Sequence, residues 1–122
     1  MNMIVSRERY KKKCLKVLND SVKWNVSKLP DNILELQLMK VDEEIDEVIR
    51  AKSYQEQVQE LADVLIAIGG IARFNKLKAV CMFNNFIGLL DKFIFMDVVD
   101  YAEQKIKILY ERNYSNGYKH DA

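Results

Sequence analysis

Residues 40–64 read KVDEEIDEVIRAKSYQEQVQELADV, and this stretch decides the fold. It contains two acidic clusters: Glu43, Glu44 and Glu47 form the first, and after a gap of twelve residues Glu60 and Asp63 form the second. Residues three or four apart share one face of a helix, so each cluster fits one helix face. A single continuous helix would separate the clusters, because Glu60 would lie roughly 220° around the axis from Glu47. The sequence therefore predicts two helices.

A turn near Ser53 brings the two clusters face to face. Ser53 is followed three residues later by a glutamate, a spacing that is typical of a capping box at the start of a helix. Positions 44 and 63 lie at equal distances from this turn, and so do positions 47 and 60. In an antiparallel pair of helices, Glu47 is then level with Glu60, and Glu44 is level with Asp63.

Four carboxylates that face each other repel and raise one another's pKa values. A hard divalent cation relieves this repulsion, and Mg²⁺ prefers oxygen ligands, including water and substrate phosphates. The competing interpretation is a solvated acidic face, which is the usual fate of a charge run. Two matched clusters about a capped turn favour the metal site, so we expect Glu44, Glu47, Glu60 and Asp63 to bind Mg²⁺, with Mn²⁺ as a substitute.

Such a site predicts metal-assisted phosphoryl or nucleotidyl transfer to water. Bound ions would bridge phosphate oxygens and lower the pKa of a bound water. The candidate catalytic residues are Glu43, Glu44 and Glu47, and a free carboxylate oxygen of Glu43 or Glu47 would accept the proton of the water. The sequence has neither a recognisable Ser/His/Asp or Cys/His set nor a P-loop.

With Lys40 in front, the pattern KxxEExxE, twelve residues and then ExxD resembles the signature of the all-α nucleoside triphosphate pyrophosphatases, the MazG-like superfamily. That superfamily includes dimeric dUTPases, dCTPases and phosphoribosyl-ATP pyrophosphohydrolases. The resemblance extends from about Ile33 to Phe74 and resumes near the C-terminus. It implies Mg²⁺-dependent cleavage of (d)NTP to (d)NMP and pyrophosphate by a homodimer or homotetramer whose active site can borrow residues across the interface.

The whole chain, residues 1–122, is expected to be one all-α domain: an antiparallel bundle of four to five helices, with its core completed by homo-oligomerisation. Four glycines and one proline argue against a turn-rich β fold. The net charge of +1 gives no field that favours a nucleic acid polymer or a membrane. We expect no signal peptide, and two cysteines without CxxC spacing fit a reducing compartment, so we expect a cytoplasmic protein.

Apolar spacing predicts helices at about 6–23, 31–51, 54–74 and 96–113. The expected core seams of the second and third helices are Leu38, Val41, Ile45 and Val48, and Tyr54, Val58, Leu61, Leu65 and Ile68. The apolar segment 75–95 is expected to form one or two short helices that meet a second subunit. Its longest uncharged run is too short to cross a bilayer. Gly69 and Gly70 each disfavour a helix by about 1 kcal/mol relative to alanine, so we expect a packing or kinking reason for them.

Several residues are candidate substrate ligands. Trp24 is expected in the connection between the first two helices, where it either stacks on a base or covers a helix end. Lys40 either neutralises an acid or reaches a phosphate. Near the C-terminus the candidates for a triphosphate are Lys105, Arg112, Asn113 and Lys119. Residues 117–120, Gly-Tyr-Lys-His, also resemble the family, but Asn116 stands where arginine is expected; a solvated terminus is the alternative.

Two other functions stay open from sequence alone. One is a phosphoribosyl-ATP pyrophosphohydrolase-like activity, which would use the same metals and a different base and ribose pocket. The other is a non-enzymatic helical interaction module whose acids are solvated or bind a structural cation. The enzyme is favoured, because carboxylates beside a core seam are unfavourable without a counter-charge.

Overall fold

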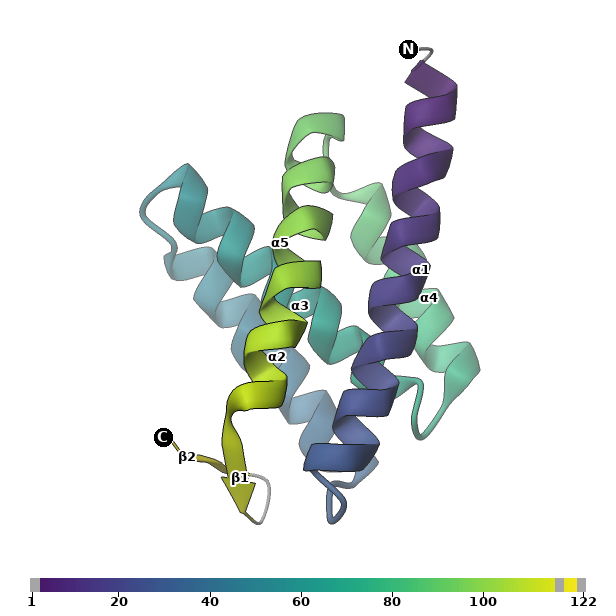
Figure 1. Cartoon of the computed structure of the whole chain (residues 1–122). Coiled ribbons are helices and arrows are strands. Elements are labelled where there is room, and N and C mark those ends of the chain that lie inside the picture. The colour runs from purple at the N-terminus through teal and green to yellow at the C-terminus, as the bar shows by residue number, and fades with distance from the viewer. Residues whose placement is uncertain (1–2, 116–117, 121–122) are drawn as a thin grey trace.

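The computed structural model describes the backbone of residues 3–115 and 118–120, and the side chains of residues 9–91 and 94–112. Its five helices are α1 (Met3–Lys28), α2 (Leu34–Arg50), α3 (Tyr54–Ile71), α4 (Lys76–Gly88) and α5 (Lys92–Glu111) (Figure 1). The prediction of an all-helical bundle is confirmed for these elements. A short antiparallel hairpin of β1 (Asn113–Ser115) and β2 (Tyr118–His120) follows α5, where the sequence had predicted a helix as far as residue 113.

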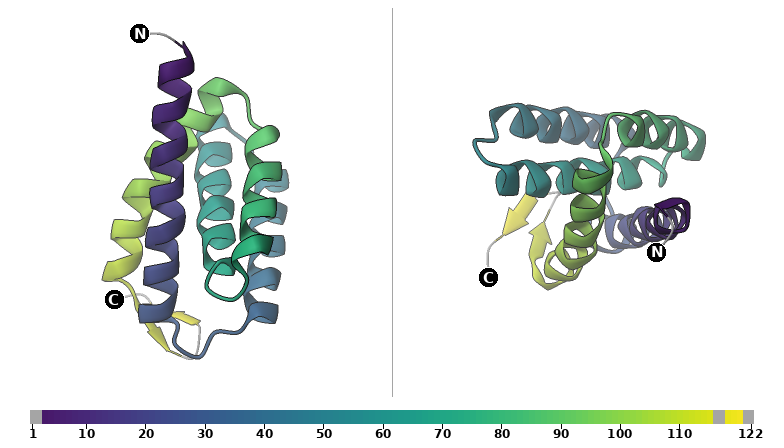
Figure 2. Two further views of the ribbon diagram at one scale, coloured as in Figure 1. Left: turned by 90° about the vertical axis from the view of Figure 1, so that its right-hand side faces the viewer. Right: turned by 90° about the horizontal axis from the view of Figure 1, so that it is seen from above.

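Helix α3 is the centre of the bundle, since it packs against each of the other four helices. Helices α2 and α4 lie on one side of it, and α1 and α5 lie on the other side and also pack against each other (Figure 2). From Val64 to Ile71 every residue of α3 is buried. A helix that is apolar all round belongs in a core, which explains this position. The chain turns back between α2 and α3 through three residues, so the two helices lie side by side (Figure 1).

The capping box at Ser53 is confirmed. The Glu56 backbone N–H donates to Ser53 Oγ at 3.1 Å, and the Glu56 carboxylate accepts from the backbone N–H of Lys52 at 2.9 Å. The expected reciprocal bond therefore goes to the residue before the cap. Two further helices begin in the same way, because Asn75 caps α4 and Asp91 caps α5 through their side-chain oxygens.

Helix α1 is longer than the predicted helix at about 6–23, and the prediction that Trp24 lies in the connection after it is wrong. Ser21 lies inside the helix, where its hydroxyl donates to the Val17 carbonyl at 2.7 Å. The helix continues through Trp24, which is buried and does not lie in a loop. It ends at Lys28, two residues before Pro30, because a residue that precedes proline is disfavoured in helical conformation.

The two helices were predicted to turn their seam residues towards the core, and this prediction is wrong at two positions. Val41, Val58, Leu65 and Ile68 are buried, whereas Ile45 is 43% exposed and Tyr54 is 52% exposed. Helix α2 is rotated so that the polar residues Gln37 and Glu44 share its inner stripe with Val41, and this moves Ile45 outward. Tyr54 is the first residue of α3, and its hydroxyl donates to the Asp97 carboxylate.

The adjacent glycines of α3 allow close approach of its neighbours. A Cβ on Gly69 would lie 2.6 Å from Ser21 Cβ and 3.2 Å from Leu18 Cα of α1. A Cβ on Gly70 would lie 2.7 Å from Gln37 Cδ and 2.9 Å from Asn25 Nδ2. The expected packing reason is thus confirmed, because these two positions set how closely α1 and α2 pack on α3.

Segment 75–95 forms α4 and the first turn of α5, in line with the predicted short helices. Leu77, Val80 and Leu89 remain exposed on it, and their contact with a second subunit stays a prediction. Within the described part of the chain, no helix combines the length and apolar character that crossing a membrane requires.

Candidate functional site

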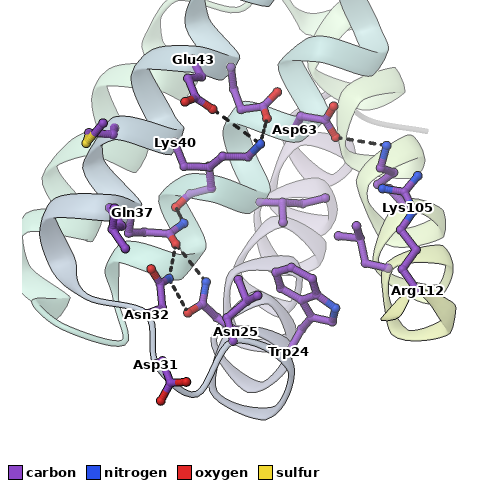
Figure 3. Close-up of a pocket in the computed structure, with 17 residues that line it drawn as sticks. Trp24, Asn25, Asp31, Asn32, Gln37, Lys40, Glu43, Asp63, Lys105 and Arg112 are labelled. Carbon is purple, nitrogen blue, oxygen red and sulfur yellow. Dashed lines mark hydrogen bonds and ion pairs between the residues drawn. The ribbon is translucent and has the colours of Figure 1, made fainter. Parts of the chain in front are cut away.

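A cleft of about 590 Å³ opens between the C-terminal part of α1 and helices α2, α3 and α5 (Figure 3). One end is acidic, with Glu43, Glu44 and Asp63. Lys40, Lys105 and Arg112 line its middle and its α5 side, and Trp24, Asn25, Asp31, Asn32 and Gln37 line the opposite end. The cleft therefore has an anionic end, cationic walls and a polar end beside an aromatic ring.

At the acidic end, the fold brings together Glu44 from α2 with Glu60 and Asp63 from α3. One carboxylate oxygen of each residue lies within 4.8 Å of those of the other two. The side chains of Glu44 and Asp63 are only 12% and 23% exposed. This grouping follows from the turn at 51–53, which places the middle of α2 against the middle of α3.

The other two predicted acids lie at the margin of this group. Glu43 lines the cleft but is exposed, and Glu47 is exposed as well. The charge of Glu47 is one of the smaller causes of the raised pKa of Glu60, so Glu47 affects this group through its charge. Three of the four expected metal ligands thus form one tight group, and Glu47 lies beside it.

Burial and mutual repulsion raise the pKa values of two of these acids. At Asp63 the largest cause is desolvation, which outweighs the opposing charge of Lys105, and the charge of Glu44 raises the pKa further. At Glu60 the largest cause is again desolvation, followed by the charges of Asp63, Glu44 and Glu47. Ionisation of Glu60 and Asp63 is therefore less favourable in the folded chain than in the unfolded chain, and a cation would offset this difference.

Two lysines partly neutralise the group. Lys40 Nζ lies 3.0 Å from Glu44 Oε1 and 3.8 Å from Glu43 Oε2, and Lys105 Nζ lies 3.6 Å from Asp63 Oδ1. Burial lowers the pKa of Lys40, but the hydrogen bond and charge of Glu44, with smaller effects of neighbouring acids, outweigh burial and leave the pKa raised. Against the three carboxylates, two ammonium groups leave one net negative charge.

The carboxylate group fits a divalent ion. Mg²⁺ takes oxygen ligands at about 2.1 Å, so two ligands on opposite sides of one ion lie about 4.2 Å apart. Adjacent ligands of one octahedral ion lie only about 3 Å apart, so oxygens spread over up to 4.8 Å must move inward by about an ångström or more, which is within the reach of side-chain torsions. Glu44, Glu60 and Asp63 are the residues that would hold the ion.

Of the four C-terminal candidates, the structure places two in the cleft. Lys105 lies on α5 beside Asp63, and Arg112, the residue that caps the end of α5, lines the same wall. Asn113 and Lys119 belong to β1 and β2, and their side chains lie outside the described residues. Trp24 lines the cleft with its buried ring, which is consistent with both the stacking and the core interpretation.

Sequence reasoning missed the polar end. Asn25, Asn32 and Gln37 are joined by hydrogen bonds, and the Gln37 amide also donates to the Ala67 carbonyl at 2.9 Å (Figure 3). Asn25 and Gln37 are 1% and 5% exposed. Positions 37, 41 and 44 have the spacing of one helix face, and this signal could have placed Gln37 on the inner stripe of α2.

Searches of the chain against models of known families, curated proteins and solved structures gave no match.

The raised pKa values predict how stability depends on pH in the absence of metal. Asp63→Asn imitates the protonated side chain, so at pH 7.5 we expect this variant to melt at a higher temperature than wild type. As the pH falls towards 3.8, the ordinary pKa of Asp63, the wild-type carboxyl takes up its proton first in the folded chain, and the difference should shrink. Thermal unfolding at pH 7.5 and at pH 5 measures the difference in melting temperature between the variant and wild type. A variant that melts below wild type at pH 7.5 would contradict this prediction.

Proposed function

We propose that this chain is a Mg²⁺-dependent nucleotide pyrophosphohydrolase that cleaves a (d)NTP to the (d)NMP and pyrophosphate. One observation carries the proposal: three carboxylates from two helices form one group, and two of them, Glu44 and Asp63, line one end of a cleft that also has cationic walls and a polar end beside an aromatic ring. The acidic end suits phosphates that are bound through a metal ion, and the cationic walls suit the remaining phosphate charge. The polar end beside the aromatic ring suits the base of a nucleotide. The resemblance of the KxxEExxE and ExxD motifs to the MazG-like superfamily agrees with it.

In this proposal the side chains act by position and charge. Lys105 and Arg112, on the α5 wall, bind phosphate oxygens, since cationic donors make short, charge-assisted bonds to phosphate. Lys40 keeps Glu44 oriented through their 3.0 Å ion pair and offers its remaining donors to the substrate. The aromatic ring of Trp24 packs against the base at the polar end.

The acids supply the rest of the chemistry. A divalent ion bound at Glu44, Glu60 and Asp63 would neutralise phosphate charge and lower the pKa of a water molecule. Glu43 and Glu47 are exposed beside this group, and each retains carboxylate oxygens that can accept the proton of the attacking water.

We further propose that the helices form an antiparallel bundle which assembles into a homodimer or homotetramer in the cytoplasm. Exposed apolar side chains support this assembly, because exposed apolar area of this kind marks interfaces; among them are Ile49 on α2, Leu77 on α4 and Leu89 directly after α4. Sedimentation of the purified chain tests it, and a monomer at high concentration would contradict it.

The proposal assigns Lys105 to phosphate binding, so Lys105→Met should raise KM about tenfold with a smaller effect on kcat. One charge-assisted hydrogen bond contributes about 1.5 kcal/mol or more, which is about tenfold in affinity. Lys107→Met is the matched control, because Lys107 is exposed on the same helix and does not line the cleft. Equal KM values for both variants would remove Lys105 from the phosphate site.

The experiment that tests the function measures products from a panel of NTPs and dNTPs with Mg²⁺ and with EDTA. We expect equal amounts of monophosphate and pyrophosphate, with Mg²⁺ only. Release of diphosphate and inorganic phosphate, or no release from any nucleotide, would contradict the proposal. Activity on phosphoribosyl-ATP alone would instead favour the related pyrophosphohydrolase.

One observation favours a second candidate, the helical interaction module. The ion pairs of Lys40 with Glu44 and of Lys105 with Asp63 already neutralise two of the three acids, as a purely structural cluster would require. That module predicts no Mg²⁺-dependent turnover and unchanged folding without divalent ions.

A further inference from the structure

A row of exposed basic side chains follows the outer face of α1. Lys12, Lys16, Asn19 and Lys23 are separated by four, three and four residues, a spacing that keeps them on one face of the helix. All four are exposed, and Lys16 keeps 69% of its side chain exposed although its Nζ lies 3.8 Å from the Asp20 carboxylate. Lys12 and Lys23 pair with no acid among the described side chains. This basic row therefore presents three ammonium groups to an outside partner.

A matching acidic row follows the outer face of α2. Glu35, Met39, Asp42 and Asp46 have the same spacing of four, three and four residues, and all four are exposed. They lie on the side of α2 opposite the buried Gln37, so they face away from the bundle. The three carboxylates pair with no cation in the part of the chain whose side chains the structure describes. Asp42 and Asp46 are one turn apart, a spacing at which like charges repel.

The two rows match when the helices run antiparallel. The facing pairs are then Lys12 with Asp46, Lys16 with Asp42, Asn19 with Met39, and Lys23 with Glu35. The two residue numbers of each pair add to 58, so a single register places every lysine of the basic row opposite an acid. A parallel alignment of the same rows would place only two lysines opposite acids. Alternating spacings of four and three residues are those of two helices that pack side by side.

One copy of the chain cannot bring its own two rows together. Helix α2 lies on one side of α3 and α1 lies on the other side, so their outer faces point away from each other (Figure 2). Each row is therefore open to another molecule. A second copy offers the opposite charge at the matching spacing, whereas a nucleic acid would satisfy the basic row and leave the acidic row unpaired.

We infer that the basic row of α1 and the acidic row of α2 are the two halves of a contact between copies of this chain. This inference deepens the proposed assembly, because it names the surfaces that meet. The contact is head-to-tail: α1 of one copy packs against α2 of the next. Contacts of this kind close into a ring or continue as an open chain. A homotetramer closed in this way would leave no row unpaired.

The contact depends on charge and is therefore sensitive to salt. Each exposed ion pair contributes little by itself, but three pairs act in one register, and they relieve the repulsion between like charges one turn apart. The same register places the stem of Arg9 opposite Ile49, which is 77% exposed. We expect a weak association that falls as the ionic strength rises.

Sedimentation velocity of the full chain at several concentrations, in about 50 mM and about 500 mM NaCl, measures this association. Wild type should associate at the lower salt and shift towards monomer at the higher salt. Lys16→Glu places two acids opposite each other, and Asp42→Lys places two cations opposite each other. Each variant alone should associate more weakly than wild type at the lower salt, by about tenfold or more.

An equal mixture of these two variants tests the register. In the mixture, the glutamate introduced on α1 of one variant faces the lysine introduced on α2 of the other, and the remaining rows are those of wild type. The mixture should therefore recover the association of wild type. Lys23→Glu with Glu35→Lys repeats the test at another facing pair, and it replaces the first pair if circular dichroism shows that either protein is unfolded.

Lys11→Glu and Glu111→Lys are matched controls, because each makes the same change of net charge at an exposed position outside both rows. Both should associate as wild type does. A wild type that stays monomeric at the lower salt, controls that lose as much association as the row variants, or a mixture that stays monomeric would overturn the inference. Retention of a monomeric wild type by duplex DNA, lost in Lys16→Glu, would assign the basic row to nucleic acid instead.

Pyrophosphate release separates this inference from the proposed hydrolase. If charge reversal abolishes association and the mixture recovers it while no nucleotide is hydrolysed, the contact stands and the hydrolase falls. If nucleotides are hydrolysed and association is insensitive to salt and to both rows, the hydrolase stands and the contact falls. Assembly would then be assigned to the exposed apolar side chains.

Discussion

Replacement of Glu44 by Gln, or of Asp63 by Asn, is expected to lower kcat on (d)NTPs by a factor of about 10² to 10⁴. Ion-assisted stabilisation of phosphate charge contributes several kcal/mol to such reactions, and each substitution removes one anionic ligand from the three-carboxylate group. Each replacement is nearly isosteric, and the amide introduced by Glu44→Gln would still offer an oxygen to the Lys40 ammonium. We therefore expect folded, inactive proteins, measured by pyrophosphate release and circular dichroism.

The control for these variants is Asp46→Asn, which removes a carboxylate from the exposed part of α2 and should leave kcat within about twofold. Glu47→Gln is informative as well, because Glu47 lies beside the group and not in it. We expect a smaller loss for Glu47→Gln than for Glu44→Gln. An equal fall in kcat for both variants would indicate that Glu47 is also a metal ligand, as the sequence spacing predicted.

Gly69→Ala is expected to lower the free energy of unfolding by about 2 kcal/mol, although alanine is the better helix former. The added Cβ would meet Ser21 Cβ at 2.6 Å and the backbone of Leu18 at 3.2 Å. Overpacking of a core costs about 1–3 kcal/mol, and here the obstacle includes the α1 backbone, which can move only as a whole helix. Urea unfolding measures the change.

Gly88→Ala is the matched control, because a Cβ there has no neighbour within 4 Å and Gly88 ends α4. It should be neutral or stabilising by up to about 1 kcal/mol. Adding Ser21→Gly to Gly69→Ala should recover part of the lost stability, since it removes the Cβ that clashes. Equal effects of Gly69→Ala and Gly88→Ala would show that the close approach of α1 to α3 does not depend on the absence of a side chain at position 69.

The acidic end could be predicted from the sequence because it depends on local rules. The capping box at Ser53 sets the turn, and the spacing of the acids about that turn sets which carboxylates meet. The same reasoning placed Lys40 beside Glu44, one helical turn apart. It did not show that Glu47 would stand outside, because that depends on the rotation of α2 about its axis.

The polar end could not be predicted, because it rests on contacts between distant parts of the chain. Ser21 and Asn25 make α1 look as if it ends early, yet both are buried against α3 and α2. Arg73 donates a hydrogen bond to Asn25 from a position far along the chain, and no local sequence pattern predicts that bond. For the same reason Trp24 was expected in a loop and lies in a helix.

The measurement that tests the central claim most directly is a titration of the metal-free chain with Mn²⁺, followed by electron paramagnetic resonance of the free ion. Wild type and Asp46→Asn should take up the ion, and both Glu44→Gln and Asp63→Asn should lose most of this uptake. No uptake by wild type, or equal uptake by wild type and these two variants, would contradict a divalent-ion site at Glu44, Glu60 and Asp63.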